Sequence, residues 1–234
     1  MGLCAVLLFA GFFSLGVWQV HRRHWKLDLI ARVNERVHAP AVDAPGPSQW
    51  PQVTPQGDEY LHVRLKGTWL PDDNTLVRAS TVLGPGYWVL TPLRRADGSL
   101  VLINRGFVAQ DARDATAALT PPAGPVTVTG LLRMSEPHGT LLQHNVPAQG
   151  RWYSRDVAAI ASAQGLHDVA PYFVDADAAP SAAAGPASAP VGGLTVISFH
   201  NSHLLYAIIW FSLSAMVAWG AWMVARDEMN LRRS

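Results

Sequence analysis

The run LLYAIIWFSLSAMVAWGAWMVA, from Leu204 to Ala225, decides the fold class of this chain, because its 22 residues carry no charge. A helix of this length measures about 33 Å at 1.5 Å per residue, enough to cross about 30 Å of hydrocarbon. Trp210, Trp219 and Trp222 suit interfacial or packed positions in such a helix. The run predicts a transmembrane helix that occupies residues 199–225 together with its entry turn.

A second apolar run, LCAVLLFAGFFSLGVWQV from Leu3 to Val20, has Ser14 and Gln19 as its only clearly polar residues. Its length is near the minimum for a membrane helix, which we place at residues 1–21. A cleaved signal peptide is the alternative interpretation. The positively charged segment that opens a signal peptide is missing, and HRRHWK stands where small residues are expected at a cleavage site, so an uncleaved anchor is favoured.

Charged residues are confined to the middle and the end of the chain. They make up 15% of the 234 residues, below the roughly 25% of an ordinary soluble domain. None precedes Arg22 and none lies between Asp177 and Arg226, whereas residues 22–177 hold 15 basic and 15 acidic side chains. A net charge of +1 without a basic stripe argues against nucleic acid as a partner. The single Cys4 excludes an intrachain disulfide and paired-cysteine metal or haem-attachment motifs.

The middle of the chain predicts an extramembrane domain over residues 22–177 that is rich in β-strands. Asp97-Gly98 joins two apolar runs as the turn of a β-hairpin, and Gly84-Pro85-Gly86 is expected to interrupt the chain before it. The expected strands are 61–66, 75–79, 87–93, 99–107, 126–134 and 172–175; helices are expected from the first span to Pro40 and over 155–164, ending at Gly165. Such a mixture predicts an α+β fold with an antiparallel sheet or partly closed barrel.

The two spans place both termini on one side of the membrane and the domain on the other. Residues 178–198 are expected to form a flexible linker, and residues 226–234 a tail. Arg226, Arg232 and Arg233 in that tail favour a cytoplasmic position for the termini.

Four histidines lie at the domain-facing ends of the two spans: His21, His24, His200 and His203. An i,i+3 pair on a helix points both rings to one side, which suits two metal ligands, or one ligand and a neighbour that orients it. The alternative is that these rings are simply solvated at the headgroups, and taken alone the spacing favours it.

His203 forms a helical stripe with Tyr206, Ala207 and Trp210, at spacings of three, four and seven. An imidazole beside a small residue and two aromatic rings resembles one wall of a pocket for a flat macrocycle. Ordinary helix packing explains the same spacing and is favoured by it. Near the first span, Arg22 and Arg23 could bind either lipid phosphates, the default, or carboxylates of a cofactor.

Four separated blocks resemble, in order, the surfeit-locus family of cytochrome c oxidase assembly factors. They are LGVWQVHRRHWKLDLI (Leu15–Ile30), GPGYWVLTPL to NRGFV (Gly84–Val108), WYSRD (Trp152–Asp156) and NSHLLYAIIWFSLS (Asn201–Ser214). Phe107 and Ala109 depart from the family pattern, which has Trp and Pro there. No transit segment rich in Arg and Ser precedes the first span, so the chain resembles a bacterial member.

The resemblance implies two membrane helices around a periplasmic β-rich domain, in an inner-membrane protein that helps to assemble an aa3-type haem-copper oxidase. It implies haem a as a transiently bound cofactor. His203 matches the histidine of the family pattern N-x-H-x-x-Y-A-x-x-W-F and would be the axial ligand of the haem iron. Tyr206 and Trp210 would then be pocket walls, and Arg22 and Arg23 propionate contacts, whereas His200, His21 and His24 are weaker candidates.

Two functional hypotheses follow from the residues and the resemblance. The first is a haem a chaperone without enzymatic activity, whose expected partners are the lipid bilayer, the catalytic subunit of the oxidase and haem a synthase. The second is a scaffold without a cofactor that stabilises an oxidase assembly intermediate. No nucleophile elbow, phosphate loop or paired-carboxylate pattern supports an enzyme.

Overall fold

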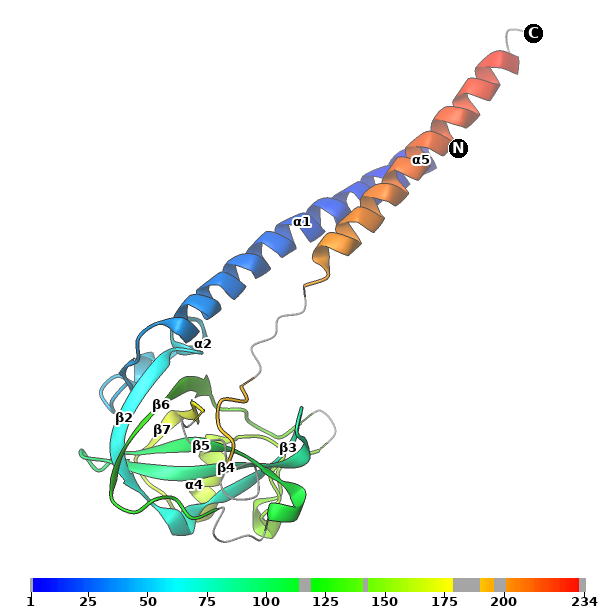
Figure 1. Ribbon diagram of the computed structural model, residues 1–234. Helices are drawn as coiled ribbons and strands as arrows, with labels where there is room; N and C mark the ends of the chain where they lie inside the picture. Colours follow the sequence, from blue (N-terminus) through cyan, green and yellow to red (C-terminus); the bar gives the residue numbers. More distant parts are fainter. Residues whose placement is uncertain (1, 114–118, 141–142, 179–189, 196–200, 232–234) are drawn as a thin grey trace. The chain divides into compact units, whose positions relative to one another are not determined.

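The structure is a computed structural model that describes residues 2–113, 119–140, 143–178, 190–195 and 201–231. The chain divides into two units, one formed by Met1–Arg32 with Ile197–Ser234 and the other by Val33–Val196. The expected fold class is confirmed, because two long apolar helices flank a small mixed β-barrel (Figure 1).

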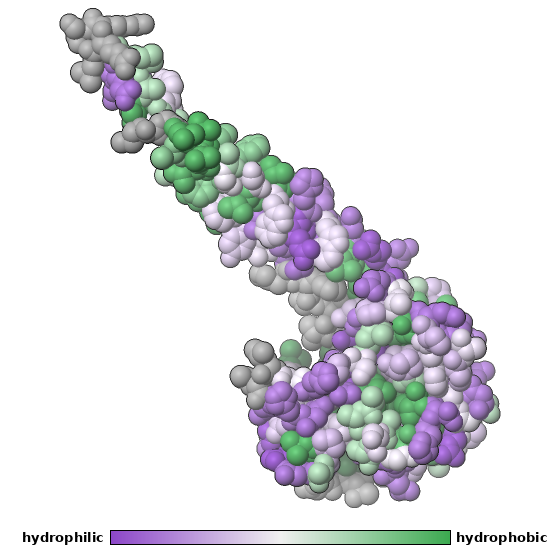
Figure 2. Space-filling view, turned by 180° about the vertical axis from the view of Figure 1, so that it is seen from behind, coloured by the Kyte–Doolittle hydropathy of each residue, from purple (hydrophilic) through white to green (hydrophobic). Residues whose placement is uncertain are grey.

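The first unit consists of α5 (His203–Leu231) and the part of α1 (Gly2–His38) that ends at Arg32. Both are long and apolar enough to cross a membrane, with mean hydropathy of 2.0 and 1.7 over their most apolar windows. On the face shown in Figure 2, apolar residues gather on the upper part of the helix pair, whereas the barrel shows hydrophilic and intermediate residues around a smaller apolar area. α1 ends just before Pro40, as the sequence predicts, because proline cannot continue the helical hydrogen bonds.

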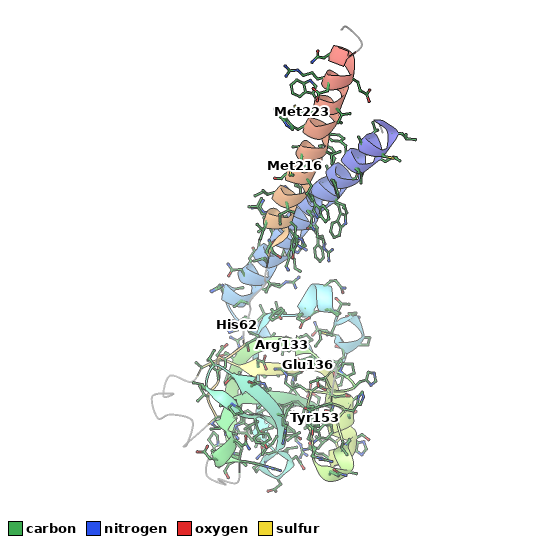
Figure 3. All side chains as sticks on the ribbon, turned by 90° about the vertical axis from the view of Figure 1, so that its right-hand side faces the viewer. His62, Arg133, Glu136, Tyr153, Met216 and Met223 are labelled. Carbon is green, nitrogen blue, oxygen red and sulfur yellow. The ribbon has the colours of Figure 1, made fainter. Side chains whose placement is uncertain are left out.

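The two helices run antiparallel, because residues later in α1 contact residues earlier in α5. Phe12 stacks on Trp210 with ring centroids 5.7 Å apart, and the Ser214 hydroxyl donates to the Phe9 carbonyl at 3.4 Å. Gly16 permits the close approach, because a Cβ there would lie 2.6 Å from the Phe211 ring. Figures 1 and 3 both show α1 and α5 side by side.

The second unit is a seven-stranded sheet in the order β1-β2-β6-β7-β5-β4-β3. Its strands are β1 (Val42–Asp43), β2 (His62–Trp69), β3 (Thr75–Thr81), β4 (Gly84–Arg95), β5 (Leu100–Ala109), β6 (Pro125–Met134) and β7 (Val169–Ala176). Pairing of the ends of β2 and β4 closes five of them into a barrel. Gly67 makes this closure possible, because a Cβ there would lie 2.3 Å from the Arg94 carbonyl oxygen.

The barrel core consists of alternate residues of the strands. Its fully buried members include Val63, Leu93, Ile103, Leu132 and Tyr172. Outside the barrel, α4 (Val157–Gln164) contributes Ile160 to a second buried cluster, which also contains Phe173 of β7. Short helical turns fill the connections: η1 (Trp50–Gln52), α2 (Pro55–Asp58), η2 (Pro71–Asp73), η3 (Gln110–Ala112) and η4 (Pro147–Gln149).

The expected hairpin, strands and helix are all present, with two differences. Gly84-Pro85-Gly86 belongs to β4 and pairs with β3, so the turn falls on Val82 and Leu83. α4 starts at Val157, because the Asp156 side chain caps it by accepting from the Ala159 amide at 3.1 Å. Its C-terminal end follows the prediction, with Gly165 left-handed at φ 65°.

The sheet is mixed, although the sequence predicted antiparallel pairing. β7 pairs in parallel with β5 and antiparallel with β6, and β1 pairs in parallel with β2. The chain reaches β7 by way of α4, and such a crossover permits parallel pairing. The alternative of a partly closed barrel is therefore the correct one.

The linker predicted over 178–198 lies largely outside the described residues. Part of it, Pro190–Thr195, is described and is tied to the barrel; we call these residues the connector. Val191 and Phe107 exchange two backbone hydrogen bonds of 2.9 Å. Gly106 permits this docking at φ +128°, because a Cβ there would lie 2.3 Å from the Val191 carbonyl. The described connector is therefore hydrogen-bonded to the barrel and is not a free linker.

Candidate functional site at the entry of the second membrane helix

His203, the first residue of α5, is held by a side chain of α1. Its Nδ1 lies 2.7 Å from Oε1 of Gln19, a residue 184 positions earlier in the chain. Gln19 is 9% exposed and His203 half-buried, so the contact lies within the helix pair rather than on its surface. An amide oxygen only accepts hydrogen bonds, so Nδ1 donates and carries the proton.

This arrangement leaves Nε2 of a neutral imidazole with its lone pair available. No hydrogen bond links Nε2 to another of the described residues. A histidine whose Nδ1 is bound to an oxygen and whose Nε2 is free has the geometry of a metal-ligating imidazole. His203 could therefore supply one nitrogen ligand to the iron of a macrocyclic cofactor. Among the described residues, no group of three or more His, Cys, Asp or Glu could form a metal site made of side chains alone.

The stripe that begins at His203 faces α1 along part of its length. Ala207 is 3% exposed and Trp210 stacks on Phe12, so both contribute to helix packing. Tyr206 lies at the margin of this interface and is 48% exposed. Its ring is accessible to a ligand, whereas the Trp210 ring is partly covered.

The other predicted residues near the first span are more exposed. His21, Arg22 and His24 are exposed, and Arg23 is half-buried. The Arg22 guanidinium lies 4.1 Å from the centre of the Trp25 ring, a cation–π contact that leaves its N–H groups available. The structure brings His203 together with Gln19 and with none of these residues. His200 lies outside the described residues.

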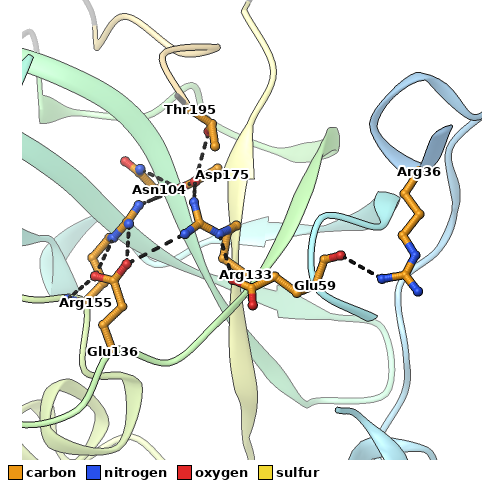
Figure 4. Close-up of polar contacts among 8 residues, drawn as sticks. All are labelled: Arg36, Glu59, Asn104, Arg133, Glu136, Arg155, Asp175 and Thr195. Atoms are coloured by element: carbon orange, nitrogen blue, oxygen red, sulfur yellow. Dashed lines mark hydrogen bonds and ion pairs between the residues drawn. The ribbon is translucent and has the colours of Figure 1, made fainter. Parts of the chain in front are cut away.

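The extramembrane domain contains a buried network of charges that the sequence patterns did not reveal (Figure 4). Asp175, on β7, is 4% exposed and accepts from four side chains. The four donors are Arg133 at 3.1 Å, Arg155 at 3.0 Å, Asn104 at 2.7 Å and Thr195 at 2.9 Å. Glu136 completes the network by accepting from Nε of Arg155 at 3.0 Å. The connector is thus tied to the barrel through a side chain of Thr195 as well as through its backbone.

The charges in this network stabilise one another. Burial opposes ionisation of Glu136, but hydrogen bonds from Arg155 and the charges of Arg155 and Arg133 hold the pKa of Glu136 below its usual range. Burial likewise disfavours the charge of Arg155, yet the carboxylates of Asp175 and Glu136 raise the pKa of Arg155. Figure 3 shows Arg133 and Glu136 together in the barrel.

A pocket of about 450 Å³ lies beside the network, between the end of β3 and the connector. Its lining residues are Ser80, Thr81, Val82, Trp88, Arg133, Arg155, Asp175, Gly193, Leu194 and Thr195. Two arginines and one carboxylate line the pocket, and both Arg133 and Arg155 are paired with Asp175. Gly193, Leu194 and Thr195 of the connector form one side of it.

Of the residues that the sequence patterns missed, Gln19 had a signal in the sequence and the charged network had none. Gln19 was one of two polar residues in an apolar span, and polar side chains in such spans commonly face a partner or a site. The pairing of Arg133, Arg155 and Asp175 had no local signal, because strands and loops far apart in sequence supply them.

Comparison with known proteins finds a family and several relatives that this chain resembles. Residues 6–215 match the model of the SURF1 family. Surfeit locus protein 1 of Mus musculus is 31% identical over 232 residues, which cover 92% of this chain and 72% of the mouse protein. The Homo sapiens protein of the same name is 30% identical over 226 residues, with coverage of 88% and 71%. A SURF1-like protein of Caenorhabditis elegans is 33% identical over 230 residues, with coverage of 88% and 69%.

Proposed function

Since this chain belongs to the SURF1 family, whose members are in general cytochrome c oxidase assembly factors without enzymatic activity, we propose that it binds haem a through His203. Its role would be to hold haem a and aid its delivery to the catalytic subunit of an aa3-type oxidase. Haem a synthase is the proposed donor of the cofactor.

The observation that carries this proposal is the orientation of the His203 ring. Its Nδ1 is bound to Gln19 and its Nε2 is free within the described residues, which is the state a haem ligand requires. Haem a, when bound, supplies the iron centre that the oxidase uses. The contributions of this chain are to bind the iron at Nε2, to orient the ring through Nδ1, and to offer the exposed face of Tyr206 as a wall.

The neighbouring candidates have secondary roles in this proposal. Arg22 and Arg23 would bind the propionates, and the cation–π contact with Trp25 holds the Arg22 guanidinium beside α1. Trp210 would contribute mainly by packing. His21 and His24 are exposed, and no side chain of the described residues orients their rings, so they are weaker ligands.

The experiment is an absorption spectrum of His203→Ala, purified from cells that make haem a and compared with the unmodified chain at equal protein. Loss of most bound haem is expected, because alanine supplies no coordinate bond. His21→Ala and His24→Ala are matched controls and should retain haem. Full haem with an unchanged Soret band in His203→Ala would refute the assignment of His203.

A scaffold without a cofactor remains a second candidate, favoured by the use of Ala207 and Trp210 in helix packing. It predicts that the unmodified chain carries no haem even where haem a is made, yet still restores oxidase assembly in a deletion strain. The same purification therefore separates the two functions.

For location, we propose a bacterial inner membrane with both termini in the cytoplasm and the domain in the periplasm. The two apolar helices and the arginines of the C-terminal tail support this orientation. Alkaline phosphatase fused after Gly165 should be active. An inactive fusion there together with an active one after Arg226 would reverse the topology.

A further inference from the structure

We propose that Gln19 is a positioning residue for His203, which selects the ring tautomer and so presents Nε2 as the ligating nitrogen. This inference rests on the proposed haem-binding function and adds a residue of the first membrane helix to it. Gln19 would not touch the iron. It would act only through the imidazole.

The contact has the features of a dedicated hydrogen bond. The Gln19 Oε1 to His203 Nδ1 distance is 2.7 Å, at the short end for an N–H to oxygen bond. Gln19 is 9% exposed, so its side chain has little freedom to turn away and little water to replace the partner. In an apolar helix pair, a neutral imidazole keeps its proton on the nitrogen that has an acceptor.

The bond also fixes the direction of the ring. With Nδ1 bound to α1, the opposite nitrogen points away from Gln19, and rotation of the ring would break the bond. Residues that accept the second N–H of a ligating histidine typically change metal affinity by 10- to 100-fold when they are removed. Gln19 therefore links the first membrane helix to the ligand on the second.

Interhelical adhesion is the competing role for Gln19, because buried amides hold membrane helices together. Ser214 offers a matched control, since it is 2% exposed and its hydroxyl also links α5 to α1, through the Phe9 carbonyl at 3.4 Å. Ser214→Ala removes an interhelical hydrogen bond without touching His203. A purely adhesive Gln19 would behave like Ser214.

The first measurement needs no haem. The full-length chain without haem, labelled with ¹⁵N-histidine in detergent, gives the tautomer of each ring, and His203→Ala identifies the signal. The unmodified chain and Ser214→Ala should both show His203 protonated at Nδ1. Gln19→Leu should lose that preference, whereas Gln19→Glu, which keeps an oxygen acceptor, should retain it.

The second measurement is haem affinity and reduction potential in the unmodified chain, Ser214→Ala, Gln19→Leu and Gln19→Glu. Gln19→Leu should bind haem about 10- to 100-fold more weakly, with Ser214→Ala close to unmodified. Gln19→Glu should retain haem and lower its potential, because a carboxylate makes the ligating imidazole more electron-rich. This shift is a readout that a merely adhesive residue would not move.

The outcomes separate the positioning role from the proposed function. An unchanged tautomer in Gln19→Leu, or a loss of haem no larger than in Ser214→Ala, would overturn the positioning role. If Gln19→Leu does not fold, an unchanged potential in Gln19→Glu would overturn it instead. If the tautomer responds as expected but the unmodified chain never retains haem, the proposed function fails while the control of the ring by Gln19 stands.

Discussion

Asp175→Asn is the substitution expected to destabilise the barrel most sharply, because it removes the charge on which two buried arginines converge. Asn has the same shape but is neutral, and its amide N–H₂ would face donors where an oxygen now accepts. The Asp175 side chain is 4% exposed, and the side chains of its partners Arg133 and Arg155 are 14% and 13% exposed. Solvent can therefore do little to replace the lost charge.

The expected loss of stability depends on the charges that stay buried after the substitution. Removing one partner of a buried ion pair typically costs about 3–5 kcal/mol when the remaining charge is left without compensation. After Asp175→Asn, Arg155 still pairs with Glu136 and Arg133 with Glu59, so a loss at the lower end, about 3 kcal/mol, is expected. Such a loss is a large share of the roughly 5–15 kcal/mol that stabilises an ordinary domain. It would lower the melting temperature by on the order of 10 °C.

The assay is urea unfolding of the full-length chain in detergent, followed by the β-sheet circular dichroism signal. Asp43→Asn is the matched control, since Asp43 also pairs with an arginine, Arg64, at 2.8 Å. Its side chain is 83% exposed and that of Arg64 44%, so this pair should contribute less than about 1 kcal/mol. If the two substitutions lower stability equally, the network around Asp175 is not the stabilising feature inferred here.

Three further predictions concern pH, the connector and the helix pair. The folded pKa of Glu136 is held below its ordinary value of 4.5, so its carboxylate stabilises the fold above that pH and loses this effect as the pH falls. In Glu136→Gln, the free energy of unfolding measured with urea should therefore fall less steeply as the pH is lowered below 4.5. Gly106→Ala should expose the connector to protease, whereas Gly98→Ala, with a positive φ but open space, should leave it protected. Gly16→Val should push α1 and α5 apart and so slow disulfide cross-linking between cysteines introduced into the two helices. Gly11→Val, where space is open, should leave the cross-linking rate unchanged.

The sequence alone was sufficient wherever the physical cause is local. Apolar runs long enough for a bilayer predicted α1 and α5 as candidate membrane spans, and the alternation around Asp97-Gly98 predicted the hairpin of β4 and β5. Gly165 predicted the end of α4, because a left-handed cap requires only its own residue and the preceding turn. The resemblance of four blocks pointed to the family that the comparisons confirmed, and it selected His203, whose role stays a prediction.

Only the tertiary structure decided which distant residues meet. The parallel pairing of β5 with β7 and the closure of the barrel at Gly67 depend on the path of the whole chain, which periodicity does not encode. The same holds for Asp175 and its arginines, and for Gln19 with His203. A hydrogen bond or ion pair acts over a few ångströms of space, whereas sequence patterns report only on neighbours within a few turns or strands. The sequence pattern singled out His203, whereas the tertiary structure places Gln19 Oε1 2.7 Å from its Nδ1.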